Sequence, residues 1–129
     1  TQSSVFVALN GDIYFDNGSN QLYYVYRWTN ASNTSVSVMQ IDSRCHGLFL
    51  DPNENIYCSM ADKHQVAKRF ANDLANTTSI IAGNGTAGST NESLSAPRGI
   101  FITKTFDLYV ADYGNHRIQL FHYGESQAT

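Results

Sequence analysis

The sequence is poor in charged residues, in cysteine and in proline. Charged residues make up 15% of its 129 positions against 42% hydrophobic residues, and there are 2 cysteines and 2 prolines. This balance excludes a charge-rich disordered segment and predicts a single domain with a modest core. The net charge is −3, and no basic cluster is larger than the pair Lys68-Arg69. We therefore expect no nucleic-acid partner.

Long apolar runs are also missing. The longest ones, such as residues 22–26, are far shorter than the roughly 20 residues that a membrane helix needs, so no contact with a membrane is expected. The first residue is Thr1 rather than Met, and no signal peptide is visible. Such a beginning is expected of a processed mature protein or of an excised fragment.

Asn-x-Ser/Thr sequons, the acceptor signals for N-linked glycans, are abundant. They lie in Asn/Gly/Ser/Thr-rich stretches between apolar runs, where a covalent glycan would meet solvent. Glycosylation requires the secretory pathway, so the sequons predict a secreted, extracellular glycoprotein. The alternative is that Asn-rich turns produce sequons by chance. The 6 sequons begin at Asn17, Asn30, Asn33, Asn76, Asn84 and Asn91.

The cysteines agree with an extracellular location. The chain has two cysteines, Cys45 and Cys58. An even number of cysteines in a chain with secretory features favours one disulfide. With no Cys-x-x-Cys motif, a thiolate zinc site is not expected. Two separately buried thiols are the alternative.

The chain contains an internal repeat. Residues 4–22, 47–66 and 99–118 align without a gap, and the extra length before the third copy lies in residues 83–95. In each copy an apolar triplet with a central Phe is followed by a second short apolar run that contains Tyr. Seven residues after that Tyr come Gln21, His64 and His116. The matching triplets are Val5-Phe6-Val7, Leu48-Phe49-Leu50 and Ile100-Phe101-Ile102, then Asp12-Ile13-Tyr14, Asn55-Ile56-Tyr57 and Asp107-Leu108-Tyr109.

Each copy is predicted to be a unit of short strands with almost no helix. Four short antiparallel strands per unit form the blade of a β-propeller, so the expected fold class is all-β. The chain is then one module, residues 1–129, with blades at about 4–42, 47–83 and 97–124. The predicted strands are 5–8, 13–15, 22–28 and 36–41, then 48–50, 56–58, 66–70 and 78–82, then 100–102, 108–111 and 118–123.

The third copy resembles the NHL repeat. The resemblance rests on Pro97-Arg98-Gly99-Ile100-Phe101-Ile102 followed by residues 107–119, Asp-Leu-Tyr-Val-Ala-Asp-Tyr-Gly-Asn-His-Arg-Ile-Gln. The second copy diverges at Met60, and the first at Ser4 and Gln21. The resemblance implies a propeller, commonly six-bladed, in proteins that bind RNA, proteins or glycans or that form extracellular scaffolds. One NHL-like group, the peptidyl-hydroxyglycine amidating lyases, is enzymatic. Together with the sequons, the repeat resembles the large extracellular NHL-repeat proteins of some invertebrates.

The most prominent residues of the third copy are interpreted as structural. The stretch 112–115 is predicted to be a turn in which Gly114 takes a positive φ and Asp112 accepts turn N–H groups, with Asn115 beside them. Arg117 could then pair with Asp112 across the hairpin. The same residues recur in NHL repeats of unrelated function, which favours a structural role over a ligand role.

Catalytic and cofactor signatures are not found. There is no nucleophile motif and no phosphate-binding loop, and His46, His64, His116 and His122 are not spaced as a metal site. We therefore predict no enzymatic activity, no metal and no cofactor.

Three blades are fewer than a propeller usually needs to close. Open ends favour self-association through the terminal strands, near residues 3–8 and 118–123, as a closed ring or a head-to-tail filament. The predicted function is thus a structural or interaction module that forms a homo-oligomer or filament. The alternative is a part of a larger ligand-binding or amidating-lyase-like propeller.

Overall fold

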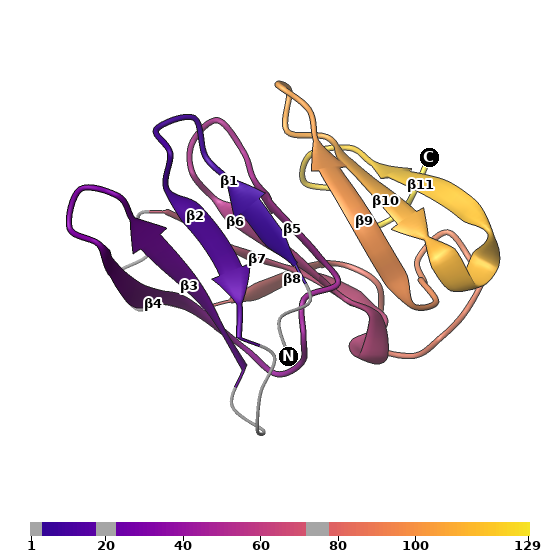
Figure 1. The fold of residues 1–129 in the computed structure, drawn as a ribbon. Coiled ribbons are helices and arrows are strands. Elements are labelled where there is room, and N and C mark those ends of the chain that lie inside the picture. Colours follow the sequence, from indigo (N-terminus) through magenta and orange to yellow (C-terminus); the bar gives the residue numbers. More distant parts are fainter. Residues whose placement is uncertain (1–3, 18–22, 72–77) are drawn as a thin grey trace.

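The structure is a computed structural model that describes residues 4–17, 23–71 and 78–129. In these ranges the chain forms three antiparallel sheets that lie side by side like adjacent blades of a fan (Figure 1). The helical segments described are two short 3-10 turns, Ala61–Lys63 and Tyr113–Asn115. No helix in the described part is long and apolar enough to cross a membrane. The predicted all-β class is confirmed.

Each sheet, here called a blade, is a meander in which consecutive strands pair. Blade 1 is β1 (Val5–Val7), β2 (Ile13–Asp16), β3 (Tyr23–Thr29) and β4 (Thr34–Ile41). Blade 2 is β5 (Gly47–Leu50), β6 (Ile56–Met60), β7 (Gln65–Arg69) and β8 (Ser79–Ala82). Blade 3, among the described residues, is β9 (Pro97–Ile102), β10 (Leu108–Asp112) and β11 (Arg117–Phe121).

The first strands of the blades, β1, β5 and β9, lie next to one another, and the later strands fan outward (Figure 1). Alternate side chains of each strand point to opposite faces, so every blade has one face toward the preceding blade and one toward the following blade. Buried side chains in the described part gather in two clusters. One fills the space between blades 1 and 2, around Val25 and Met39, and the other lies between blades 2 and 3, around Val66 and Leu94.

The strand register corrects the gap-free alignment of the first copy. Tyr57 lies opposite Lys68 and Tyr109 opposite Leu120, each eleven positions later, whereas Tyr14 lies opposite Arg27, thirteen positions later. The turn between β2 and β3 is therefore two residues longer than its counterparts. Gln21, which the alignment matched to the two histidines, lies outside the described residues.

The turn after β10 also differs from the prediction. Gly114 is not among the described residues with positive φ; His116 takes that conformation, with φ 53°, as His64 does in blade 2, with φ 56°. The prediction that Gly114 supplies the left-handed residue is wrong. Glycine is needed there for another reason, because a Cβ would lie 2.7 Å from the carbonyl oxygen of Ser95.

Candidate functional site

Asp112 lies at the end of β10, fully buried, and organises the turn that follows it. Its Oδ1 accepts a hydrogen bond from the backbone N–H of Ser95 at 2.7 Å. Its Oδ2 accepts bonds from Asn115 Nδ2 and from Arg117 Nε, both at 2.8 Å. A buried carboxylate needs such donors because desolvation would otherwise oppose its charge. The structure thus places Arg117 against Asp112 and gives the carboxylate three donors from the protein itself.

The same turn holds the inserted segment between blades 2 and 3. Asn115 Nδ2 also donates to the carbonyl of Gly88 at 2.7 Å. Arg117 donates to the carbonyls of Ser89 at 2.9 Å and Thr90 at 2.7 Å. Because these donors are used within the chain, Asn115 and Arg117 hold the segment in place, as a structural role requires.

The histidines are dispersed. His64 Nδ1 accepts a bond from the backbone N–H of Ala96 at 3.1 Å, and His122 Nδ1 lies 3.3 Å from Asp107 Oδ1. A backbone hydrogen bond from Tyr123, aided by Thr105 and His122, lowers the pKa of Asp107. Across the described ranges, no three His, Cys, Asp or Glu side chains converge as metal ligands would.

Cys45 and Cys58 form a disulfide. Cys45 lies in the connection between blades 1 and 2, and Cys58 lies in the middle of β6, so the bond attaches that connection to the second blade. Both cysteines are fully buried in the core between the two blades.

The sequon asparagines within the described residues lie outside regular strands. Asn30, Asn33, Asn84 and Asn91 are exposed, whereas Asn17 is half-buried. Asn17 extends the pairing of β2 with β3, because its N–H donates to the carbonyl of Tyr24 and its Oδ1 accepts the N–H of Tyr24. Asn76 lies outside the described residues.

A row of phenylalanines crosses the first strands of the three blades. Phe6, Phe49 and Phe101 occupy the same repeat position, and neighbouring ring centroids are 5.0 Å apart in both pairs. They lie in an open groove of about 780 Å³ whose rim carries Asn10 and Lys104 from the turns at the end of the inner strands. Aromatic rings with a few polar groups at the rim are typical of a small-molecule site. The repeat made this row visible in the sequence, although only the structure shows the rings in contact.

Equivalent residues in different blades differ sharply in exposure. Facing the preceding blade, Leu50 and Ile102 are 7% and 3% exposed, whereas Val7 of blade 1 is 62% exposed. We call the exposed side of blade 1 the head face, formed by Val5, Val7 and Phe15.

The opposite pattern holds at the other end. Facing the following blade, Tyr57 and Val66 of blade 2 are 2% and 0% exposed, whereas their equivalents Tyr109 and Ile118 in blade 3 are 40% and 66% exposed. We call the exposed side of blade 3 the tail face, formed by Phe101, Tyr109 and Ile118. Each face presents apolar side chains that an adjacent blade buries elsewhere in the chain.

Solved structures show which fold this arrangement belongs to. The chain is similar to a streptogramin B lyase (15% identity, TM-score 0.67, covering 94% of this chain and 37% of that one). It is also similar to a virginiamycin B lyase from Staphylococcus aureus (12% identity, TM-score 0.68, covering 97% of this chain and 39% of that one). A third similar structure is an auxiliary nutrient binding protein from Bacteroides thetaiotaomicron (16% identity, TM-score 0.70, covering 94% of this chain and 33% of that one). The fold is that of a β-propeller. No protein-family model and no curated protein matches the sequence.

The propeller similarity is one of fold, and the chain spans about a third to two fifths of the length of those proteins. It corrects one prediction. The chain was expected to be non-enzymatic, but two of these propellers are lyases, so the expectation is overturned: this blade arrangement is one that enzymes use. The resemblance to the NHL repeat stays a prediction.

Proposed function

We propose that this chain is a secreted, N-glycosylated propeller module that associates head to tail with a second copy, and that the assembly encloses a binding site along the phenylalanine row. The observation that carries the proposal is the exposure of the head and tail faces at positions that are buried between blades inside the chain. The exposed sequons and the disulfide support the extracellular location.

The two faces are complementary because the blades are repeats. Within the chain, the tail side of blade 1 packs on the head side of blade 2, and the tail side of blade 2 packs on the head side of blade 3. The tail face of blade 3 can therefore pack on the head face of blade 1 of another molecule by the same contacts. This contact is heterologous, so it closes into a ring if the rotation per blade permits and otherwise extends into a filament.

The phenylalanine row extends to the edge of the tail face. Phe101 is exposed on that side, whereas Phe49 contacts a ring on either side. In a head-to-tail assembly, Phe6 of the next molecule would continue the row and the open groove would become enclosed. Contiguous exposed apolar side chains with polar residues at their rim are typical of interaction sites.

We also revise the predicted contact through strand edges. The backbone edge of β11 is partly occupied, because Thr129 N–H donates to the carbonyl of Leu120 at 2.8 Å. The exposed apolar side chains lie on the faces of the same terminal strands, so we assign the contact to the faces.

Light scattering coupled to size-exclusion chromatography, over a range of concentrations, tests the proposal on the glycosylated chain. We expect a mass of at least two copies of the 14.3 kDa polypeptide plus glycans. Val7→Asp on the head face and Ile118→Asp on the tail face should each give monomers. Val36→Asp, at an exposed position on β4 away from both faces, is the matched control and should assemble like the wild type. A wild-type protein that stays monomeric, or face variants that assemble normally, would overturn the proposal.

A second candidate follows from the length of the similar structures. Further blades of one longer protein could cover both faces, and the module would then be part of a ligand-binding propeller. A stable monomer of the chain that binds a separately produced blade segment through the same two faces would favour this candidate.

A further inference from the structure

Lys68 of β7 lies at the bottom of a cleft between blades 2 and 3. The residue is only 5% exposed although its side chain carries an amine. The Nζ atom lies 4.2 Å from the ring centroid of Phe70, 5.2 Å from that of Tyr57 and 5.7 Å from that of Tyr123. The negative faces of aromatic rings attract an ammonium group, so three rings from two blades surround this one.

Within the described residues, the amine of Lys68 contacts aromatic rings, and no hydrogen-bond acceptor or carboxylate among them lies within bonding distance of Nζ. The carboxylate whose charge acts on it, Asp51, is occupied elsewhere. Its Oδ2 accepts the hydroxyl of Tyr57 at 2.8 Å and Nδ2 of Asn55 at 2.8 Å. Burial lowers the pKa of Lys68, and the charge of Asp51 offsets this only in part.

The equivalent position in blade 1 shows the contrast. Arg27 lies opposite Tyr14 as Lys68 lies opposite Tyr57. Burial raises the pKa of the Tyr14 hydroxyl, and a side-chain hydrogen bond with Arg27 lowers it in part. The guanidinium of Arg27 thus acts on the hydroxyl of its own tyrosine. In blade 2 the tyrosine hydroxyl donates to Asp51 instead, which leaves the lysine amine without such a bond.

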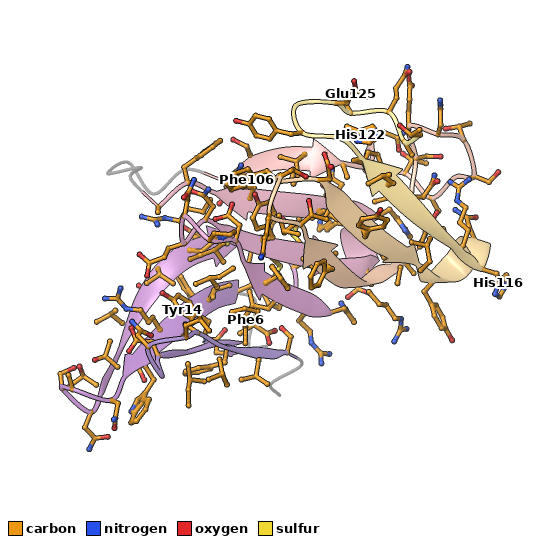
Figure 2. All side chains as sticks on the ribbon, turned by 90° about the horizontal axis from the view of Figure 1, so that it is seen from above. Phe6, Tyr14, Phe106, His116, His122 and Glu125 are labelled. Atoms are coloured by element: carbon orange, nitrogen blue, oxygen red, sulfur yellow. A yellow bond between two sulfur atoms is a disulfide. The ribbon has the colours of Figure 1, made fainter. Side chains whose placement is uncertain are left out.

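The cleft above Lys68 has room for a small molecule. Its volume is about 430 Å³, and its walls include the apolar side chains of Ile80 and Phe106. His122 and Glu125 also line it, and Figure 2 shows Phe106, His122 and Glu125 on the side of the molecule away from Phe6 and Tyr14. The cleft is therefore separate from the phenylalanine row and lies within one chain.

We propose that this cleft binds a small organic acid with an aromatic or branched aliphatic body, whose carboxylate pairs with Lys68 Nζ while its apolar part packs on Ile80, Phe106 and Tyr123. A buried cation gains most from an anion delivered into the same water-poor space. The apolar walls favour a hydrophobic body over a bare inorganic anion. This site goes beyond the proposed assembly, because no residue of the head or tail face contributes to it.

A pair of isosteric probes tests the proposal on the wild-type glycosylated chain. Phenylacetate and phenylacetamide differ in charge but little in shape, and both are titrated by isothermal calorimetry. We expect phenylacetate to bind at least about tenfold more tightly than the amide. Equal binding of the two probes, or no binding of phenylacetate at millimolar concentration, would overturn the proposal, whatever any variant does.

Two lysine variants locate the binding. Lys68→Met should abolish the preference for phenylacetate over phenylacetamide. Lys63→Met, at an exposed lysine of the turn after β6, is the matched control and should bind like the wild type. A Lys68→Met protein that unfolds like the wild type but keeps the preference would show that the anion binds elsewhere. Val7→Asp should bind phenylacetate unchanged, which separates this proposal from the one on assembly.

Discussion

Arg117 Nε donates a 2.8 Å hydrogen bond to Oδ2 of Asp112, and the aspartate side chain is completely buried while the arginine is 29% exposed. The bond joins the two ends of the turn between β10 and β11. Since the same guanidinium also donates to carbonyls of the segment between blades 2 and 3, one side chain connects the last blade to the insertion that precedes it.

Replacing Asp112 should therefore destabilise both the turn between β10 and β11 and the segment between blades 2 and 3. In Asp112→Asn an amide N–H would face the donors Arg117 Nε and Asn115 Nδ2, and we expect a loss of about 3 kcal/mol in the free energy of unfolding. Asp62→Asn, at an exposed aspartate in the turn after β6, should change it by less than about 0.5 kcal/mol. Urea unfolding followed by circular dichroism measures both. Equal stability of the two variants would contradict the structural role of Asp112.

Two glycines at the same repeat position give a second prediction. A Cβ at Gly47 would collide with the backbone carbonyl of Arg98 in the next blade, whereas a Cβ at Gly99 would lie 3.9 Å from its nearest neighbour, Ala111. Gly47→Ala should thus destabilise the fold by about 2 kcal/mol, and Gly99→Ala should be neutral or slightly stabilising. Thermal unfolding of the two variants provides the comparison. A Gly99→Ala variant as unstable as Gly47→Ala would refute this reading of the contact between blades.

The disulfide should contribute substantially to stability. Cys45 and Cys58 are 13 positions apart, and closing a loop of this size is worth about 3 kcal/mol in the chain-entropy account. The double variant Cys45→Ala/Cys58→Ala should lose about that amount in urea unfolding. Dithiothreitol should destabilise the wild type to a similar extent and leave the variant unchanged. A wild type insensitive to the reductant would show that the bond contributes little.

Tyr57 gives a prediction on pH. Burial, the hydrogen bond to Asp51 and the charge of that carboxylate raise the pKa of Tyr57 above its ordinary value of 10.0. Above pH 10 the unfolded chain ionises this phenol more readily than the folded one, so stability falls as the pH rises through that region. Tyr57→Phe should lower the free energy of unfolding by about 2 kcal/mol at neutral pH, because the bond to Asp51 is removed. Between about pH 9.5 and 11, the free energy of unfolding of this variant should fall less than that of the wild type. Parallel pH curves for the two proteins would contradict the raised pKa.

The sequons differ in how a glycosidase can reach them. Asn17 is half-buried and pairs with Tyr24, whereas Asn84 and Asn91 are exposed. Under native conditions, peptide N-glycosidase should release a glycan from Asn84 and Asn91 faster than from Asn17, as followed by glycopeptide mass spectrometry. Unfolding the protein first should abolish the difference. Absence of glycan at every sequon in secreted material would instead refute the proposed glycosylation.

Much of the fold followed from the repeat. The apolar triplets and the Tyr-containing runs predicted β1, β2, β5, β6 and β10 to within two residues, because alternation and turn residues mark such short strands clearly. The gap-free alignment of the first copy with the other two is wrong after Phe15. A two-residue difference in turn length cannot be seen where the sequence is composed of turn residues.

The conformation of the turn after β10 could not be predicted from the sequence either. A glycine suggests a positive φ, yet His116 adopts it, because the close approach of Ser95 determines where glycine is required. The environment of Lys68 was hidden for a similar reason. Its three rings come from β6, from the residue after β7 and from the residues after β11, and no local pattern indicates that they meet.

The attachment of Cys45 to β6 has a mechanical consequence. If a tensile force pulled on the two ends of the chain, the 13 positions spanned by the disulfide could not extend when blade 2 unravels. At about 3.5 Å per residue, this shortens the extensible contour by about 40 Å. Reduction of the bond would release that hidden length, so the redox state of this cysteine pair would determine how far the module stretches under load.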